Sequence, residues 1–371
     1  MNIAVLGAGM VGRTIAIDLA ARHNLTSFDI NENNLGLIAA ERKIQKVQFD
    51  LTNVDAAAFY NYDIIVSAVP GWMGYRTLEA IIRQGKNVVD ISFFPEDPFS
   101  LSQLALEKNV TAVVDCGVAP GMSNMIFGHC DAKMRINSFH CVVGGLPKVR
   151  VKPFEYKAPF SPMDVVEEYT RPARYVENGF EVVKPALSDV EHMYFDKVGT
   201  LEAFNSDGLR TLIKTMSHIP NMKEKTLRYP GHADLMRSLI SSGFLSSVKG
   251  KNGISPLEYN SRILFDQWKL GSEEDEFTIM QIAIAGEGKR ITYNLYDENE
   301  KMETKFSSMS RTTGYTCTAA VELILQGLFK EKGLYAPESL GSKDECFSFV
   351  IKYLADRNVV YQRTEEIIPL R

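Results

Sequence analysis

The sequence has few of the features that mark secreted, membrane-spanning or metal-dependent proteins. Its 371 residues contain only five cysteines, and these are scattered: Cys116, Cys130, Cys141, Cys317 and Cys346. An odd, unclustered set favours reduced thiols over a disulfide framework, so we expect a cytoplasmic protein. None of the cysteines lies at metal-ligand spacing from a histidine, so we expect no metal. No apolar run approaches the roughly 20 residues that span a bilayer.

The chain also lacks a strong excess of charge of one sign. It has 41 Lys and Arg against 46 Asp and Glu, a formal net charge of −5. This mildly acidic balance lacks the basic footprint of nucleic-acid-binding proteins, so we expect neither nucleic acid nor a membrane as a partner. Residues 1–5 lead directly into an apolar strand, so we expect no signal peptide. The length and the 45% apolar content suffice for two domains with a large core.

The most informative segment is a glycine-rich turn near the start of the chain. Residues 1–6 read as a buried strand, residues 13–20 have apolar residues at helical spacing, and Gly7, Gly9 and Gly12 lie between them. In such a G-x-G-x-x-G turn the first glycine permits the tight turn, the second lets a pyrophosphate approach, and the third allows close helix packing. We assign Met10 and Val11 to the same cofactor-binding turn, because a helix N-terminus there offers N–H groups to phosphates.

Asp29 ends the second expected strand, about 20 residues after the glycines. A carboxylate at this position can accept hydrogen bonds from the ribose 2′-hydroxyl and repels a 2′-phosphate. Residues 30–33 contain no Arg or Lys, so the sequence favours NAD over NADP as the cofactor. The alternative interpretation is an ordinary glycine turn with a solvated aspartate.

Strand and helix patterns then alternate through the first third of the chain, with further strands expected at residues 44–49, 62–70, 87–92 and 110–115. Repeated β-α units predict an α/β fold with a doubly wound parallel sheet of the Rossmann type. Ligands on such sheets bind beyond the carboxyl ends of the strands. We therefore assign further cofactor contacts at these ends: Asp50 near the adenine, Ser67, Ala68, Val69 and Pro70 near the nicotinamide ribose, and Ser92.

The pattern changes after Asp115, where a loop leads into a helix and then into long strands mixed with helices. We interpret this part as an α+β domain inserted into the first. The expected boundaries are residues 1–124 and 310–371 for a discontinuous NAD-binding Rossmann domain, and 125–309 for a substrate and catalytic domain. The long strands of the second domain can pair across a two-fold axis, so we expect a homodimer.

Several motifs along the chain together carry a resemblance to one family. They are Val89-Asp90-Ile91-Ser92, Asp115-Cys116-Gly117-Val118-Ala119-Pro120-Gly121, Gly144-Gly145-Leu146-Pro147, Tyr156-Lys157, Arg171-Pro172-Ala173-Arg174, Asn205-Ser206-Asp207-Gly208, Thr226-Leu227-Arg228-Tyr229-Pro230-Gly231 and Arg311-Thr312-Thr313-Gly314. In this order the chain resembles the saccharopine dehydrogenase-like oxidoreductases, most closely their lysine 6-dehydrogenase branch. The resemblance implies a saccharopine reductase-like fold and an amino acid as the small-molecule substrate.

Three departures distinguish this chain within the family that it resembles. The fungal saccharopine-forming members have an acidic residue at the position of Ala119, a cysteine at that of Val143 and an arginine at that of Ser206. Losing an arginine removes a bidentate clamp for a carboxylate, which favours a substrate with fewer carboxylates than saccharopine. The favoured function is NAD-dependent oxidative deamination of the ε-amino group of L-lysine to the 6-semialdehyde, which cyclises to piperideine-6-carboxylate.

Three residues are the candidate catalytic groups. Asp90 and Asp115 follow adjacent strands, where carboxylates can attract a cationic amine and accept its proton. Lys157 can bind a carboxylate or act as a base if it is buried. The alternatives are that the two aspartates cap loops and that Lys157 lies on the surface.

The candidate substrate-binding residues are Asn124, Tyr156, Arg171, Arg174 and Thr312. Asn124 lies at a helix start, where capping is the alternative. Thr312 lies at another expected helix start, whose N–H groups can bind an anion. The two arginines can recognise a carboxylate or form an interdomain salt bridge.

Two other functions remain open from the sequence. One is a saccharopine- or carboxynorspermidine-type dehydrogenase that joins an aldehyde to an amine by imine reduction. The other is a non-catalytic NAD-binding protein, which the charged set of Asp90, Asp115, Lys157 and Arg171 disfavours.

Overall fold

The computed structural model describes residues 1–38, 43–54, 59–250, 253–271, 273–301 and 305–368. The chain forms two compact units, of which the first comprises Met1–Arg135 and Met309–Tyr361 and the second Ile136–Ser308 and Gln362–Arg371. In the described residues, no helix is both long enough and apolar enough to cross a membrane.

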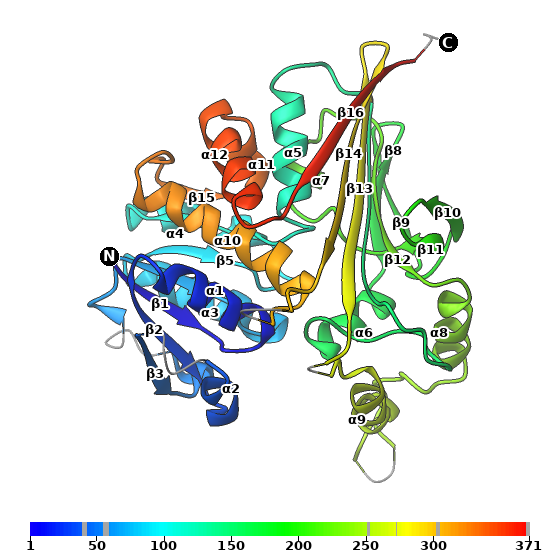
Figure 1. The fold of residues 1–371 in the computed structure, drawn as a ribbon, viewed down its shortest axis with the longest axis horizontal. Coiled ribbons are helices and arrows are strands. Elements are labelled where there is room, and N and C mark those ends of the chain that lie inside the picture. The colour runs from blue at the N-terminus through cyan, green and yellow to red at the C-terminus, as the bar shows by residue number, and fades with distance from the viewer. Residues whose placement is uncertain (39–42, 55–58, 251–252, 272, 302–304, 369–371) are drawn as a thin grey trace. The chain divides into compact units, whose positions relative to one another are not determined.

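The first unit is built on a seven-stranded parallel sheet in the order β15-β6-β5-β4-β1-β2-β3 (Figure 1). Its strands are β1 (Asn2–Leu6), β2 (Asn24–Asp29), β3 (Ile44–Gln48), β4 (Ile64–Ser67), β5 (Asn87–Asp90), β6 (Thr111–Val113) and β15 (Gly333–Tyr335). All four residues of β4 are buried, as in a strand covered on both faces. This is the predicted doubly wound arrangement, with its reversal of strand order at β1 and β4.

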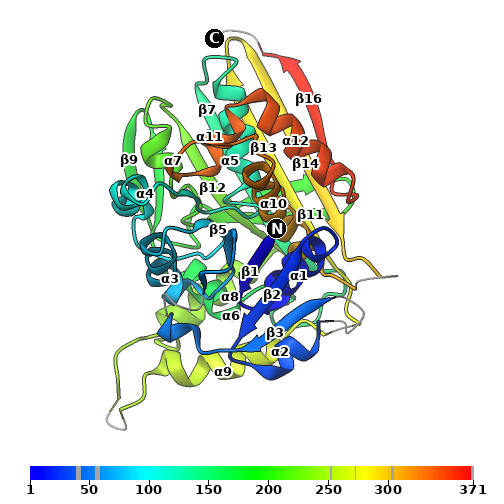
Figure 2. The same cartoon turned by 90° about the vertical axis from the view of Figure 1, so that its left-hand side faces the viewer.

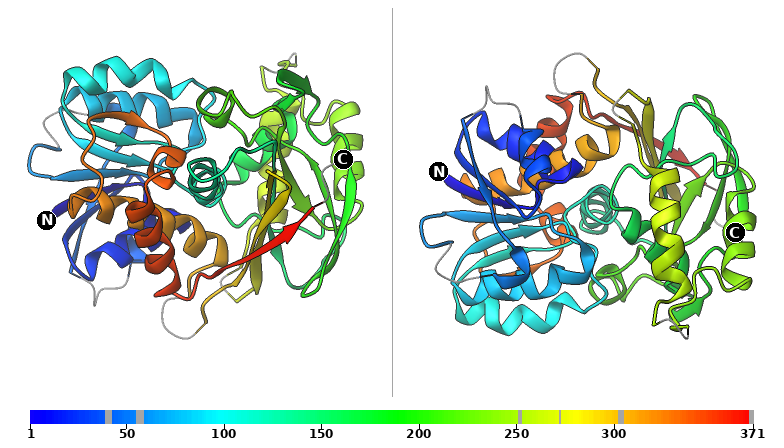
Figure 3. Two further views of the ribbon diagram at one scale, coloured as in Figure 1. Left: turned by 90° about the horizontal axis from the view of Figure 1, so that it is seen from above. Right: turned by 90° about the horizontal axis from the view of Figure 1, so that it is seen from below.

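Helices cover both faces of this sheet (Figure 3). They are α1 (Met10–Ala20), α2 (Glu32–Gly36), α3 (Gly71–Arg83), α4 (Ser102–Glu107), α5 (Met122–Asp131), α10 (Ser308–Leu325), α11 (Pro337–Gly341) and α12 (Asp344–Ala355). Leu6, Phe28, Ile65 and Leu78 belong to one continuous apolar core of this unit.

The second unit contains a nine-stranded mixed sheet, in which β7, β13 and β14 are long neighbouring strands (Figure 2). The main order is β10-β11-β12-β7-β13-β14-β16, with β8 pairing with β12 and β9. The strands are β7 (Ser138–Pro147), β8 (Ala173–Glu177), β9 (Phe180–Lys184), β10 (Glu191–Phe195), β11 (Gly199–Asn205), β12 (Met222–Arg228), β13 (Glu276–Gly286), β14 (Lys289–Glu298) and β16 (Tyr361–Ile367). Its helices are α6 (Pro162–Thr170), α7 (Leu212–Thr215), α8 (His232–Ser241) and α9 (Pro256–Trp268).

The two units divide the chain differently from the boundaries expected from the sequence. Helix α5 lies in the first unit, so the first division falls after Arg135 rather than after Asn124. The last strand, β16, pairs with β14 of the second unit's sheet, whereas the sequence pattern suggested that the whole segment 310–371 belongs to the first. Strand pairing, which a single-sequence pattern does not encode, accounts for the placement of β16.

Helix α5 stays in the first unit because it packs at very short range against α11. A Cβ atom built on Gly128 lies 2.1 Å from the carbonyl oxygen of Glu338, and one built on Gly341 lies 2.0 Å from that of Met125. Real Cβ contacts are never this short, so both positions require glycine. The two glycines let the helix backbones touch.

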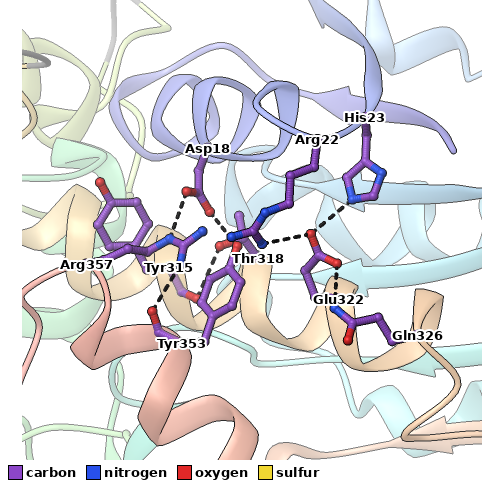
Figure 4. A network of polar contacts seen from close by, with 9 residues as sticks. All are labelled: Asp18, Arg22, His23, Tyr315, Thr318, Glu322, Gln326, Tyr353 and Arg357. Carbon is purple, nitrogen blue, oxygen red and sulfur yellow. Dashed lines mark hydrogen bonds and ion pairs between the residues drawn. The ribbon is translucent and has the colours of Figure 1, made fainter.

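A polar network joins α1 to α10 and α12 in the first unit (Figure 4). Asp18 accepts hydrogen bonds from Tyr353 Oη at 2.7 Å and from Arg357 Nε at 2.8 Å. Glu322 on α10 lies 3.0 Å from His23 Nε2. Because these side chains are largely buried, the charge-assisted hydrogen bonds hold the C-terminal helix against the first helix more firmly than surface pairs do.

The close α5–α11 contact predicts that one methyl group added at Gly128 strongly lowers the stability of the fold. We expect Gly128→Ala to lower the free energy of unfolding by about 2 kcal/mol or more, because the helices must separate. Gly36→Ala in α2 is the matched control: its Cβ meets nothing within 4 Å, and alanine favours helix by up to about 1 kcal/mol. Denaturant unfolding measures both variants, and equal stabilities contradict the close-packing interpretation.

Candidate functional site

The glycine turn has the geometry that a dinucleotide requires. Gly7 has a φ of +99°, and its Cβ would lie 2.4 Å from the carbonyl oxygen of Ala68. A Cβ on Gly12 would lie 2.0 Å from the carbonyl oxygen of Gly7. A Cβ on Gly9, in contrast, meets nothing within 4 Å. The turn is therefore tightly packed at its first and third glycines and open at the second, where a pyrophosphate approaches in this motif.

Helix α1 starts at this open position and has no side-chain cap. Gly9 is its N-cap residue, and no acidic residue lies in the first turn, which contains Met10 and Val11. The first N–H groups of a helix have no partner within the helix, and the helix dipole makes its N-terminus favourable for an anion. The residues present fit the diphosphate of a dinucleotide cofactor.

Asp29 connects the end of β2 to the glycine turn. Its Oδ2 accepts a hydrogen bond from the backbone N–H of Ala8 at 2.7 Å, and its Oδ1 accepts one from the N–H of Asn31 at 2.7 Å. Asn34 Nδ2 donates to Oδ2 at 3.3 Å. A carboxylate has about four acceptor positions, so these three bonds still leave one for a ribose hydroxyl. The Asp29 side chain also stabilises the glycine turn itself through its bond to the Ala8 N–H.

The other expected cofactor residues lie at the carboxyl edge of the same sheet. Asp50 is exposed and accepts hydrogen bonds from Thr52 N at 2.9 Å and Thr52 Oγ1 at 2.7 Å, which lower the pKa of its carboxyl. Ser67 is fully buried at the end of β4. Ala68 and Val69 follow it, and Pro70 precedes helix α3 as its N-cap. Nothing in this geometry tests whether Asp50 or Pro70 contacts a cofactor. Their cofactor-binding roles therefore stay predictions.

Asp90 lies at the centre of a small buried polar group. Its carboxylate accepts hydrogen bonds from Ser92 N at 2.9 Å and Ser92 Oγ at 3.1 Å, and the Ser67 hydroxyl also donates to it. Burial raises the pKa of the Asp90 carboxyl to about 7, with a further small rise from the charge of Asp115. A carboxyl of this kind gains or loses a proton near neutral pH, which suits acid–base chemistry. The same bonds also serve the expected alternative role, because they fix the turn after β5.

A backbone hydrogen bond made by the residue after Asp115 brings Asp115 next to Asp90. The N–H of Cys116 donates to the carbonyl oxygen of Asp90 at 3.0 Å, which joins the ends of β5 and β6. Asp115 itself is buried and has a φ of +53°, in the left-handed region that non-glycine residues rarely adopt. Such backbone strain persists only where neighbours impose it, and it is common at functional sites.

Asn124 is fully buried and its side-chain amide is engaged by the protein. Its Oδ1 accepts hydrogen bonds from Gly121 N at 3.2 Å and Ser123 Oγ at 3.1 Å, and its Nδ2 donates to Glu338 Oε2 at 3.0 Å. Helix capping, the alternative that the sequence left open, explains these contacts. The proposed substrate contact has no support from them.

Thr312 does not lie at a helix start, contrary to the sequence-based expectation. Helix α10 begins at Ser308, so Thr312 is more than one turn inside it and is fully buried. Its hydroxyl donates back to the carbonyl oxygen of Met309 at 3.3 Å. Ser308, Ser310 and Thr312 are all buried, so packing of the helix rather than the local preference of these residues places them in it.

Lys157, in the second unit, binds the C-terminal end of α9. Its Nζ donates to the carbonyl oxygens of Gln267 at 3.1 Å and Lys269 at 3.2 Å, and Glu274 Oε1 lies 3.6 Å away. A cation at the last carbonyls of a helix is stabilising. These contacts support a structural role and give no support to a catalytic one.

The two arginines assigned to substrate both pair with carboxylates of the same unit. Arg174 makes a bidentate pair with Asp207, with Nε–Oδ1 and Nη2–Oδ2 distances of 2.9 Å each. Arg171 pairs with Glu167, four residues earlier on α6. Both contacts are salt bridges inside the second unit, and they differ from the interdomain salt bridge that the sequence analysis gave as the alternative.

Tyr156 belongs to a buried cluster that the sequence analysis did not assemble. The guanidinium of Arg228 lies 4.3 Å from the centre of the Tyr156 ring and donates to Tyr169 Oη at 3.0 Å and to Glu168 Oε2 at 2.8 Å. His232 Nε2 lies 2.9 Å from Tyr169 Oη. The sequence of β12 contains four charged residues in seven and gives no sign of burial, so the pattern alone carried no signal for this cluster.

His232 stays neutral in this cluster. Its Nδ1 lies 2.9 Å from the carbonyl oxygen of Phe154, and burial together with the charge of Arg228 lowers the pKa of the imidazole to about 3. In the described residues, no three His, Cys, Asp or Glu side chains form a group that could hold a metal ion.

Comparisons with known proteins identify the family. Residues 3–113 match the saccharopine dehydrogenase NADP binding domain, and residues 117–359 match the saccharopine dehydrogenase C-terminal domain. The chain is 22% identical to saccharopine dehydrogenase [NADP(+), L-glutamate-forming] of Saccharomyces cerevisiae, over 99% of both chains. It is 21% identical to mouse mitochondrial α-aminoadipic semialdehyde synthase, over 91% of this chain and 45% of that protein.

The solved structures agree on the fold. The apo structure of saccharopine dehydrogenase (L-Glu forming) from S. cerevisiae superposes with a TM-score of 0.78 at 19% identity, over 98% of this chain and 99% of that chain. The family resemblance and the α/β fold predicted from the sequence are confirmed. The named relatives are saccharopine dehydrogenases and aminoadipic semialdehyde synthases, so they support the saccharopine alternative better than lysine 6-dehydrogenase.

The raised pKa of Asp90 predicts a pH-dependent stability. Between the usual aspartate pKa of 3.8 and about 7, the folded state holds a proton that the unfolded state has lost. The free energy of unfolding therefore falls as the pH rises through this range, by up to about 1.4 kcal/mol per pH unit from this group. Asp90→Asn removes this component.

Denaturant unfolding of both proteins at intervals from pH 4.5 to 8 measures the difference. The exposed Asp50→Asn serves as the control and is expected to leave the decline in place. The interpretation fails if Asp90→Asn shows the same decline as the unsubstituted protein.

Proposed function

The chain belongs to the saccharopine dehydrogenase family, and on that basis we propose that it oxidises a secondary amine of the saccharopine type. The observation that carries this proposal is the match to both family domains along nearly the whole chain. In the reaction, a C–H and an N–H bond of the amine are replaced by a C=N bond. Water then splits the resulting imine into an aldehyde and a primary amine. The chemistry that a bound nicotinamide cofactor supplies is to accept the hydride from the carbon of that C–H bond.

The proposed roles of this chain's residues follow from the first unit's sheet edge. The glycine turn and the start of α1 bind the diphosphate, and Asp29 binds the adenosine ribose. Asp90 takes up the amine proton, a role that its pKa of about 7 and its burial support. The Ser92 hydroxyl, which donates to the Asp90 carboxylate at 3.1 Å, passes the proton to it.

Direct oxidation of lysine is the second candidate. It is supported by the charge balance of the second unit, where Arg171, Arg174 and Arg228 each form an ion pair with a carboxylate of the chain. An arginine already paired in this way is a poorer clamp for a substrate carboxylate. Lysine has one carboxylate and saccharopine has three, so this balance favours lysine over saccharopine.

A substrate panel tests the two candidates against each other. The absorbance of the reduced cofactor is followed with saccharopine, with lysine alone, and with an aldehyde and amino acid pair in the reverse direction, each with NAD and NADP forms. Turnover with saccharopine, or with glutamate and the aminoadipic semialdehyde, supports the proposal. Turnover with lysine alone supports the second candidate. Cofactor binding by calorimetry without turnover of any member of the panel rejects both and leaves a non-catalytic nucleotide-binding protein.

We further propose NAD rather than NADP as the preferred cofactor, although the relatives are named for NADP. Asp29 is buried beside the turn, and residues 30–33 carry Glu32 and no cation that could bind a 2′-phosphate. A carboxylate at this position repels the extra phosphate. The family match establishes a dinucleotide-binding domain without fixing this choice.

Asp29→Asn is expected to weaken NAD binding and to raise the ratio of NADP to NAD affinity by tenfold or more. The amide oxygen can still accept the Ala8 N–H, which keeps the bond to the glycine turn, while the amide nitrogen no longer accepts the Asn31 N–H; circular dichroism verifies that the variant folds. Calorimetric titration with both cofactors measures the ratio. Glu79→Gln removes a charge from the surface of α3 and serves as the control. An unchanged ratio in Asp29→Asn removes Asp29 from cofactor selection.

A further inference from the structure

Arg13 on helix α1 is a cation that has no counter-ion among the described residues. It follows Gly12, the last glycine of the dinucleotide-binding turn, and it is half-buried. Burial lowers the pKa of its guanidinium below the ordinary arginine value, and no carboxylate in the described part of the chain offsets this. The residues one turn away from it on the helix are all uncharged: Gly9, Met10, Ala16 and Ile17.

This position is unfavourable for a positive charge when nothing is bound. A partly desolvated cation is stabilised mainly by a partner of opposite charge, which the described residues do not offer to Arg13. Arg13 also lies in the N-terminal part of α1, where the helix dipole favours anions over cations. An arginine stays protonated under ordinary conditions, so it cannot relieve the cost by losing its proton. The guanidinium therefore gains a partner when an anion binds beside it.

The helix geometry places Arg13 over the open part of the glycine turn. Its backbone N–H donates to the carbonyl oxygen of Gly9 at 2.9 Å, so the two residues are one turn apart on the same face of α1. Long side chains on a helix lean toward its N-terminus and cover the turn before them. Gly9 is exposed, and a Cβ built on it meets nothing within 4 Å. Arg13 is thus directed toward the space that the diphosphate of a dinucleotide enters in this motif.

We propose that Arg13 binds the diphosphate of the cofactor, in addition to the backbone N–H groups of the glycine turn. A guanidinium can donate two parallel N–H bonds to phosphate oxygens, and such charge-assisted bonds are about twice as strong as neutral ones. Partial removal from water strengthens them further. This role of Arg13 rests on the dinucleotide binding that the proposed function includes, and it adds a charged side chain to a turn that otherwise offers backbone groups.

Two other anions have the chemistry to pair with a guanidinium. One is the 2′-phosphate of NADP, which extends from the ribose next to Asp29, at the end of β2 rather than on α1. The other is a carboxylate of the substrate. The diphosphate is favoured over both because it is the group that this motif brings to Gly9, one turn before Arg13.

Calorimetric titration of the full chain with NAD and with NADP, in the absence of substrate, tests the proposal. Arg13→Met removes the charge and keeps an apolar stem, and it is expected to raise the dissociation constant for NAD by roughly 10- to 100-fold. Arg13→Lys keeps the charge without the fork of donors and is expected to recover part of this loss. Lys108→Met is the matched control, because Lys108 is exposed at the end of α4, before β6, and so at the opposite edge of the sheet.

Unfolding of the protein without cofactor gives an independent readout. Arg13→Met is expected to unfold at the same or a higher denaturant concentration than the unsubstituted protein, because it removes an unpaired cation from the N-terminal part of α1. A lower unfolding midpoint shows that Arg13 stabilises the fold itself and overturns the proposal.

The binding measurements can also overturn it. Unchanged NAD affinity in Arg13→Met does so, and so does an equal loss in Lys108→Met. A loss confined to NADP assigns Arg13 to the 2′-phosphate, and a raised substrate KM with unchanged NAD affinity assigns it to a substrate carboxylate. If the unsubstituted protein binds neither cofactor, the proposed function fails together with this role of Arg13. If only the role of Arg13 is wrong, the unsubstituted protein and Arg13→Met bind NAD equally well.

Discussion

The backbone contact between the glycine turn and the end of β4 is the constraint on which the first unit's site depends. Gly7 approaches the carbonyl of Ala68 so closely that no side chain fits, and Gly12 packs on Gly7 in the same way. This contact fixes where α1 begins, and Asp29 then ties the end of β2 to the same turn through Ala8. Three strand ends are thus held together before any ligand binds, which lowers the entropy cost of binding one.

Local chemistry was sufficient to predict most of the first unit. The glycines, the buried β-branched runs and the acidic strand ends encode their roles within a few residues of themselves, and the sheet forms as they indicate. Strand β15 was missed because its three residues, Gly333–Tyr335, show no periodic pattern. The start of α10 was misplaced because Ser308 and Ser310 also fit a loop, and only the packing of the helix makes them helical.

The partners of the candidate site residues were not predictable from the sequence. Asn124 bonds to Glu338, Lys157 caps a helix that ends more than 100 residues later, and Arg174 pairs with Asp207. Each contact is made by the tertiary fold across a long stretch of chain, so a residue type at a motif position indicates several roles equally well. Asp90 differs, because its partner Ser92 is two residues away and its burial follows from its strand.

The network between α1 and the C-terminal helix has a consequence for how the protein is made. Asp18 is 335 residues before Tyr353 and 339 before Arg357, and β15 joins the edge of the first sheet only after residues 136–308 of the second unit have been synthesised. At roughly 5–20 residues per second, the nascent N-terminal part of the first unit, residues 1–135, waits on the order of tens of seconds at the ribosome for these segments. During that time the β6 edge and the flank of α1 lack the partners that cover them in the folded chain.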